Sequence, residues 1–185
     1  MTQSDRHEQE DNDPWNPMAA REAETPGTAL SVLMLFGSLC LVFAVAAVGA
    51  SVTASSVNDW YPALFKPALT PPPWVFPIAW NLLYFMMALA AWLVWLKSGS
   101  LLAAGAPLSL FGSQLMLNLG WSVLFFGLRA PGIALAEISV LLLLIALTTL
   151  IFFRRSTLAG ILMLPYLAWV GFATYLNAGI WLLNG

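Results

Sequence analysis

Four long stretches of this chain contain no charged residue, and they limit the folds that it can adopt. They lie between Glu24 and Asp59, Lys66 and Lys97, Lys97 and Arg129, and Arg155 and Gly185. Each is long enough for the roughly 20 residues with which a helix spans a bilayer. A fifth apolar segment runs from Pro131 to Arg154 and carries only Glu137. Only 9% of residues are charged, against about 25% in soluble domains, so we predict an all-α integral membrane protein.

The spacing predicts a bundle of five transmembrane helices, at residues 28–53, 74–96, 105–128, 132–153 and 157–183. They occupy nearly all of residues 28–185, which we expect to form one membrane domain. Residues 1–27 contain seven of the nine acidic residues and few apolar ones, a composition typical of a disordered tail. The tail does not have the basic and then apolar pattern of a signal peptide.

Cysteine and histidine are almost absent from the chain. Cys40 is the single cysteine and His7 the single histidine, and His7 lies in the acidic tail. A disulfide within the chain is therefore excluded, and a His- or Cys-ligated metal or haem iron inside the membrane is not expected.

The distribution of Lys and Arg predicts the orientation. One side of the membrane would hold five of them and the opposite side would hold Lys66 and Arg129. Because positive residues accumulate on the cytoplasmic side, we expect a cytoplasmic N-terminus. Helical spans favour a bacterial inner membrane, since outer-membrane proteins are generally barrels.

Three predicted helices carry aromatic and amide side chains on one face. These stripes are Trp80 and Tyr84; Gln114, Asn118, Trp121 and Phe125; and Tyr166, Trp169, Ala173 and Asn177. Amides in a membrane generally face the bundle interior. Hydrogen bonding between helices alone would explain them, but the aromatic residues on the same stripes favour a ligand pocket.

The opposite face of helix 105–128 carries small residues at four-residue spacing, Gly105, Ser109 and Ser113. Such patterns let helix backbones approach closely. We infer a homodimer through this face, with tight packing inside one protomer as the alternative.

Glu137 is the one acidic residue expected at membrane depth. An intramembrane carboxylate is a functional candidate, but Glu137 lies little more than a turn inside its helix. The structural interpretation, in which it reaches the interface or pairs with Arg129, is therefore preferred.

The connection between the first two helices is long, aromatic and rich in proline. Long ordered loops are commonly lids or binding loops. This one is predicted to cover an opening between helices; the plainer interpretation is an interfacial loop that leads into a helix.

The segments WYPALFKPALTPPPWVFPIAWNLLY, QLMLNLGWSVLFFGL and PYLAWVGFATYLN together resemble the tryptophan-rich sensory protein family (TspO/MBR), which includes the mitochondrial translocator protein. The resemblance covers residues 30–184. It implies a five-helix membrane protein, usually dimeric, that binds protoporphyrin IX, haem, and isoquinoline or benzodiazepine ligands. No cofactor is obligatory and no catalytic residue is implied.

Carried over from the family, the pocket would consist of Trp80, Tyr84, Gln114, Asn118, Trp121, Trp169, Ala173 and Asn177. The loop above it would contribute Trp60, Tyr61, Lys66, Pro67, Pro71 and Pro72. Leu69 stands where members often have an aromatic residue, and no charge follows Arg155, so the cholesterol motif of animal members is absent there.

Three functions remain open at this point. The preferred one is a membrane ligand-binding or sensory protein in tetrapyrrole and stress regulation, with no nucleic-acid partner. The first alternative is a light-dependent porphyrin-degrading enzyme, although no nucleophile–base pair or paired carboxylates are found. The second is a small porphyrin or lipid transporter, for which Glu137 is the sole charged candidate.

Overall fold

A computed structural model describes residues 27–185, in which helices predominate and no strand occurs. The long helices are α3 (Thr28–Ala54), α5 (Val75–Ser98), α6 (Leu101–Ser122), α7 (Pro131–Arg155) and α8 (Thr157–Asn184). All five are long and apolar enough to cross a membrane. The predicted all-α fold with five such helices is confirmed. The predicted disordered tail lies outside the described residues, except for Gly27.

Local sequence signals set several helix ends. The hydroxyls of Ser100 and Ser156 accept hydrogen bonds from backbone N–H groups of the first turns of α6 and α8, as N-cap residues do. Pro131 occupies the first turn of α7, where its missing N–H costs nothing. Gly99 ends α5 with a left-handed φ of 72°, a conformation that glycine adopts without strain.

Helix α6 differs from its prediction at both ends. It begins at Leu101 rather than at residue 105, because Ser100 caps it there. Its last turn is a π-helical segment, η1 (Val123–Gly127), which ends with Leu128 N–H bonded to the Val123 carbonyl at 2.8 Å. Such turns are frequent at functional sites. This one leads directly into Arg129, whose φ is 52°.

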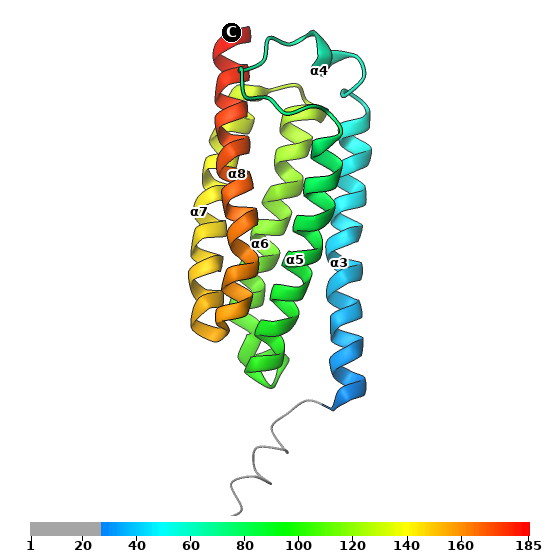
Figure 1. Ribbon diagram of the computed structural model, residues 1–185, viewed down its shortest axis with the longest axis vertical. Coiled ribbons are helices and arrows are strands. Elements are labelled where there is room, and N and C mark those ends of the chain that lie inside the picture. Colours follow the sequence, from blue (N-terminus) through cyan, green and yellow to red (C-terminus); the bar gives the residue numbers. More distant parts are fainter. Residues whose placement is uncertain (1–26) are drawn as a thin grey trace, which may run out of the picture.

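The long helices pack in the circular order α3, α5, α8, α7 and α6, and α6 closes the circle by contacting α3 and also α5. Side chains of α6 and α8 form hydrogen bonds with each other across the interior, and Figure 1 shows the arrangement of the five long helices. At one end, the segment after α3 crosses the bundle, forms the short helix α4 (Trp60–Ala63) and reaches the end of α8 before it returns to α5.

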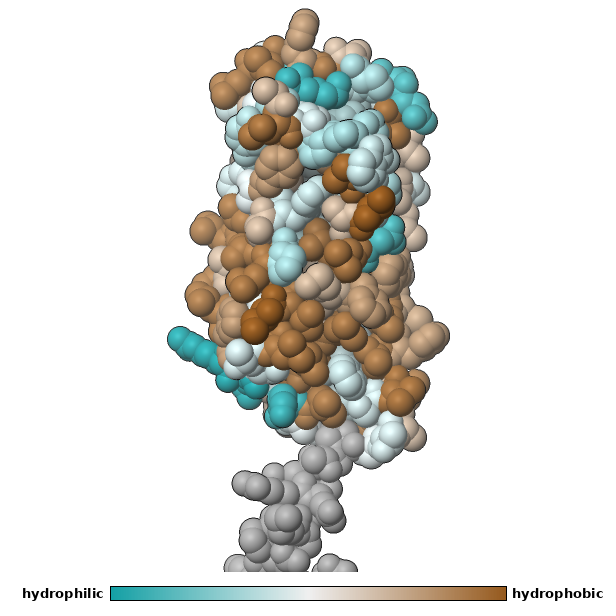
Figure 2. All heavy atoms as spheres, in the orientation of Figure 1, coloured by the Kyte–Doolittle hydropathy of each residue, from teal (hydrophilic) through white to brown (hydrophobic). Residues whose placement is uncertain are grey.

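The outer surface is apolar along the bundle. Large hydrophobic side chains such as Leu33, Phe36 and Leu143 are more than half exposed. Figure 2 shows hydrophobic residues over the middle of one face and the most hydrophilic residues gathered mainly near the ends. This distribution fits a bilayer around the protein, and the chain is a multi-pass membrane protein.

Candidate functional site

A chain of hydrogen bonds between polar side chains runs through the interior where α5, α6 and α8 meet. The Tyr84 hydroxyl donates to Asn118 Oδ1 at 2.8 Å, and Asn118 Nδ2 donates to the Tyr166 hydroxyl at 3.2 Å. Tyr166 in turn donates to Gln114 Oε1 at 2.8 Å. All four side chains are buried. We call this set the interior network; it joins three helices deep in the bundle.

One donor of the interior network has no partner. Gln114 Nε2 is sealed from solvent and makes no hydrogen bond with any described residue. Buried polar groups are nearly always hydrogen-bonded because desolvation without a partner costs free energy. The Gln114 amide therefore has unused donor capacity at the centre of the site.

Aromatic rings lie beside the interior network on α5 and α8. The Trp80 ring centroid lies 5.4 Å from that of Tyr84 and 6.3 Å from that of Tyr166. Trp169 meets Phe76 edge to face at 6.0 Å. Trp80 and Trp169 are only half-buried, so part of each indole remains uncovered.

A second aromatic cluster lies beneath the loop. Trp121 stacks on Phe125 with the centroids 5.1 Å apart, and its indole N–H donates to Asn177 Oδ1 at 2.9 Å. Asn177 Nδ2 donates to the Pro131 carbonyl at 2.7 Å. Trp121 packs against both this cluster and the main core, so it connects the two parts of the site.

The first part of the loop is anchored on that cluster. Trp60 and Tyr61 meet Phe125 edge to face, with centroid distances of 5.6 and 6.4 Å. Arg129 Nη2 lies 3.0 Å from Asp59 Oδ2. The Trp60 backbone N–H, and then the Arg129 guanidinium, hold the pKa of Asp59 below its usual value. Burial raises the pKa of Tyr61.

The second part of the loop turns onto α8. Lys66 Nζ donates to two carbonyls of its own loop and lies 4.9 Å from the Tyr61 ring centroid, so it points back into the loop and not into the bundle. The Pro67 ring lies directly against Gly179 of α8. Pro71 is half-buried and Pro72 is exposed, with its carbonyl accepting from the Val75 N–H at the start of α5.

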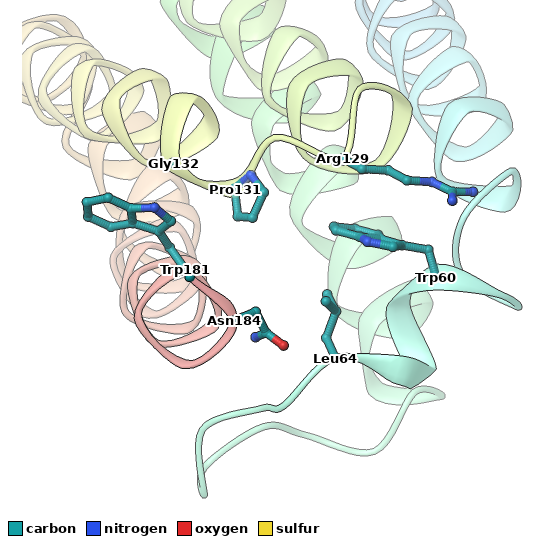
Figure 3. A pocket seen from close by; sticks show the side chains of 8 residues that line it. Trp60, Leu64, Arg129, Pro131, Gly132, Trp181 and Asn184 are labelled. Atoms are coloured by element: carbon teal, nitrogen blue, oxygen red, sulfur yellow. The ribbon is translucent and has the colours of Figure 1, made fainter.

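A hollow of about 360 Å³ opens at the edge of the loop. Figure 3 shows Trp60 and Leu64 on its loop side and Trp181 and Asn184 of α8 opposite them. The Arg129 stem borders it, but the guanidinium points away from α8. The hollow lies outside the interior network, at the boundary between α8, the α6–α7 turn and the loop.

The structure thus brings most of the predicted pocket residues together, but in two groups. Trp80, Tyr84, Gln114 and Asn118 lie at or beside the interior network, whereas Trp121 and Asn177 lie beneath the loop. Ala173 packs against the main core between them along α8. The predicted site omitted Tyr166, although it belongs to the same stripe as Trp169 and bonds to two other members of the network.

The expected pairing of Glu137 with Arg129 is not found. Arg129 turns toward the loop and pairs with Asp59, while Glu137 lies further inside α7. Both Glu137 carboxylate oxygens are sealed from solvent and have no hydrogen-bond partner among the described residues; a Cβ added at Gly120 of α6 would lie 3.6 Å from Glu137 Oε1. Within residues 27–185, no cluster of three His, Cys, Asp or Glu side chains could hold a metal ion.

The small-residue face of α6 is left uncovered by the part of the chain that the structure describes. Ser109 and Ser113 are exposed, and a Cβ added at Gly105 would have nothing within 4 Å. Tight packing of this face inside one protomer, the alternative considered from the sequence, is not found among residues 27–185.

These features define a class of protein: a multi-pass helical membrane protein with an aromatic, amide-rich interior beneath an ordered loop. The TspO/MBR family profile matches residues 38–182, and the chain belongs to this family.

Relatives in three domains of life are similar over most of their length. The chain is 39% identical over 155 residues to the tryptophan-rich protein TspO of Archaeoglobus fulgidus, a match that covers 84% of this chain and 99% of that protein. It is 42% identical over 143 residues to the tryptophan-rich sensory protein of Cereibacter sphaeroides, covering 76% and 87%. It is 41% identical over 123 residues to the human translocator protein, covering 66% and 73%.

Proposed function

We propose that this protein binds a flat tetrapyrrole, protoporphyrin IX or haem, beside the interior network and acts as a sensory protein in tetrapyrrole and stress regulation. Isoquinoline and benzodiazepine compounds would use the same site. The observation that carries the proposal is the unpartnered Gln114 Nε2 next to the Trp80, Tyr84 and Tyr166 rings. A ligand with an aromatic plane and a polar edge would pack against these rings and accept a hydrogen bond from Gln114 Nε2.

The chemistry of the surrounding side chains supports a flat aromatic ligand. Buried aromatic side chains remove about 150–250 Å² each from water and prefer offset or edge-to-face contacts with other rings. The uncovered parts of Trp80 and Trp169 offer such faces. The Gln114 amide would donate to a polar atom of the ligand, and no metal ligand from the protein is required.

The decisive test is quenching of tryptophan fluorescence by protoporphyrin IX in detergent. Wild type should show saturable quenching. Trp80→Ala should weaken the affinity at least about tenfold, because the porphyrin ring would lose its contact with the Trp80 indole. Trp92→Phe is the matched control on the same helix: its indole bonds to the Ser31 carbonyl at 3.0 Å, at the end of α5 away from the loop. Equal quenching curves for Trp80→Ala and wild type would contradict the proposal.

The affinities from this assay, combined with two further measurements, separate the two alternative functions. If Trp80→Phe and Trp121→Phe keep the affinity but stop loss of porphyrin absorbance under light, the protein is a porphyrin-degrading enzyme. If Glu137→Gln abolishes porphyrin flux into vesicles but leaves the affinity unchanged, it is a transporter. If binding and light-dependent loss fall together, the site serves binding.

The assembly and orientation are part of the proposal. The uncovered Gly105, Ser109 and Ser113 face supports a homodimer through α6, and Ser109→Leu, which places a bulky group on it, should give monomers in detergent. Lys97, Arg154 and Arg155 lie at the end of the bundle where α3 begins, opposite Lys66 and Arg129. This distribution supports a cytoplasmic N-terminus in a bacterial inner membrane.

A further inference from the structure

The loop between α4 and α5 is clamped to the last turn of α8 by one side chain. Asn184 Oδ1 accepts from the Phe65 backbone N–H at 3.0 Å, and Asn184 Nδ2 donates to the Phe65 carbonyl, also at 3.0 Å. A single amide therefore satisfies both backbone groups of a residue that is 119 positions away in the chain. This is the pairing that a neighbouring β-strand would supply.

Little else holds this part of the loop. The side chains of Phe65 and Leu69 are 73% and 67% exposed, so they contribute little burial. The Pro67 ring lies against Gly179 of α8, and Leu64, at the start of this segment, packs on the cluster that contains Phe125 and Ile180. Segments with few buried apolar contacts open at low free energy, so the Asn184 bonds are a main restraint on residues 65–70.

The opposite part of the loop is held more strongly. Ser56 Oγ donates to the Phe126 carbonyl at 2.7 Å, and Arg129 bonds to both Ser56 and Asp59. The Trp60 and Tyr61 rings pack on Phe125. The hollow lies between these two attachments and is bordered by Asn184 itself. Release of the weaker attachment would widen the hollow toward the Trp121 cluster.

We propose that Asn184 is a positioning residue that holds the loop closed over the site, so that release of its two hydrogen bonds sets the rate at which tetrapyrrole enters and leaves. This inference rests on the proposed function. A ligand bound beside the interior network would not reach Asn184, so the clamp would be the same in the free and bound protein. Its loss therefore changes the rate constants and not the equilibrium.

Stopped-flow quenching with protoporphyrin IX measures both rate constants. Asn184→Ala is expected to raise the association and dissociation rate constants together, each at least about fivefold. This factor corresponds to the loss of two modest hydrogen bonds that stabilise the closed loop. The dissociation constant stays within about twofold of wild type. Asn184→Asp, which keeps the acceptor for the Phe65 N–H, should give a smaller increase. Leu182→Ala, which truncates an exposed side chain of the same helical turn, is the matched control and should leave both rates unchanged.

Hydrogen exchange of the Phe65 amide tests the clamp without ligand. Exchange should be faster in Asn184→Ala than in wild type and Leu182→Ala. Unchanged exchange would overturn the clamp, and faster exchange with unaltered ligand rates would overturn its control of access. A weaker affinity with an unchanged association rate would assign Asn184 to ligand contact instead. If wild type shows no saturable quenching, the proposed function fails and the control of access with it, while the exchange measurement still reports whether the clamp exists.

Discussion

Trp121 donates its indole N–H to Asn177 across the bundle, over 2.9 Å, and so links α6 to α8 beneath the loop. The Asn177 amide uses its other end to bind the Pro131 carbonyl at the start of α7. One buried asparagine therefore holds three helices together at the end that the loop covers. This makes the residue structural as well as a candidate for ligand contact.

Asn177→Ala should destabilise the fold. It leaves the Trp121 N–H and the Pro131 carbonyl without their partner, at a cost of about 1–3 kcal/mol in the free energy of unfolding. Thermal unfolding in detergent measures the change. Asn81→Ala is the control, since Asn81 is exposed and bonds within its own helix to Pro77; a comparable loss in both variants would contradict the assignment.

Tyr166→Phe should weaken both stability and tetrapyrrole affinity. It removes the hydroxyl that bonds to Gln114 and Asn118, at about 1–2 kcal/mol of stability. The freed Gln114 amide would then rotate away from its present position, which lowers the affinity. Calorimetry and fluorescence quenching provide the two measurements. Tyr175→Phe, at an exposed position of α8, should behave as wild type.

Gly179→Ala should displace the loop. A Cβ at this position would overlap the Pro67 ring, whereas one at Gly37 on α3 would meet nothing within 4 Å. Faster amide exchange across residues 64–70 is expected for Gly179→Ala and unchanged exchange for Gly37→Ala. Identical exchange patterns in the two variants would show that Pro67 does not pack on α8 in the membrane.

Acid should weaken the attachment of the loop at Asp59. The folded-state pKa of Asp59 is lowered from 3.8, so its contribution to stability is complete above this value. It is lost as the pH falls below 3.8 through the lower folded-state pKa. Wild type should therefore lose more stability than Asp59→Asn on acidification from about pH 5 to pH 3. Parallel stability curves for the two proteins would refute a role for this carboxylate.

Glu137→Gln should stabilise the protein. The Glu137 oxygens are sealed from solvent without a partner, and a neutral amide costs less to bury than a carboxylate. We expect an increase of about 1 kcal/mol in detergent unfolding and unaltered tetrapyrrole affinity. A loss of affinity would place Glu137 in the binding site and would require a revised account of α7.

The five long helices could be predicted because charges are excluded from the bilayer interior, so gaps between charged residues mark the spans. The start of α6 was predicted too late, at residue 105, whereas the Ser100 hydroxyl caps the helix so that it begins at Leu101. The π-helical turn could not be predicted, since it depends on how Phe125 and Phe126 pack beneath the loop. Hydrophobic periodicity contains no information about that packing.

The inward stripes were predictable because amides avoid lipid, and this identified Gln114, Asn118 and Asn177 as interior residues. The division of the site into two groups could not be predicted, because it depends on which tyrosine hydroxyl bonds to which amide. Sequence reasoning also missed Asn184 and Gly179. Nothing near them in the chain signals a contact with residues 65–67, which precede them by more than a hundred positions.

The clamp between Phe65 and Asn184 joins the loop after the first long helix to the final turn of the last one. During synthesis, the loop is made long before its partner. The clamp can form only after α8 has left the ribosome and packed beside α5, so a chain with only the first four long helices in the membrane would hold the loop through its first attachment alone. Both attachments of the loop are in place only once α8 has been made.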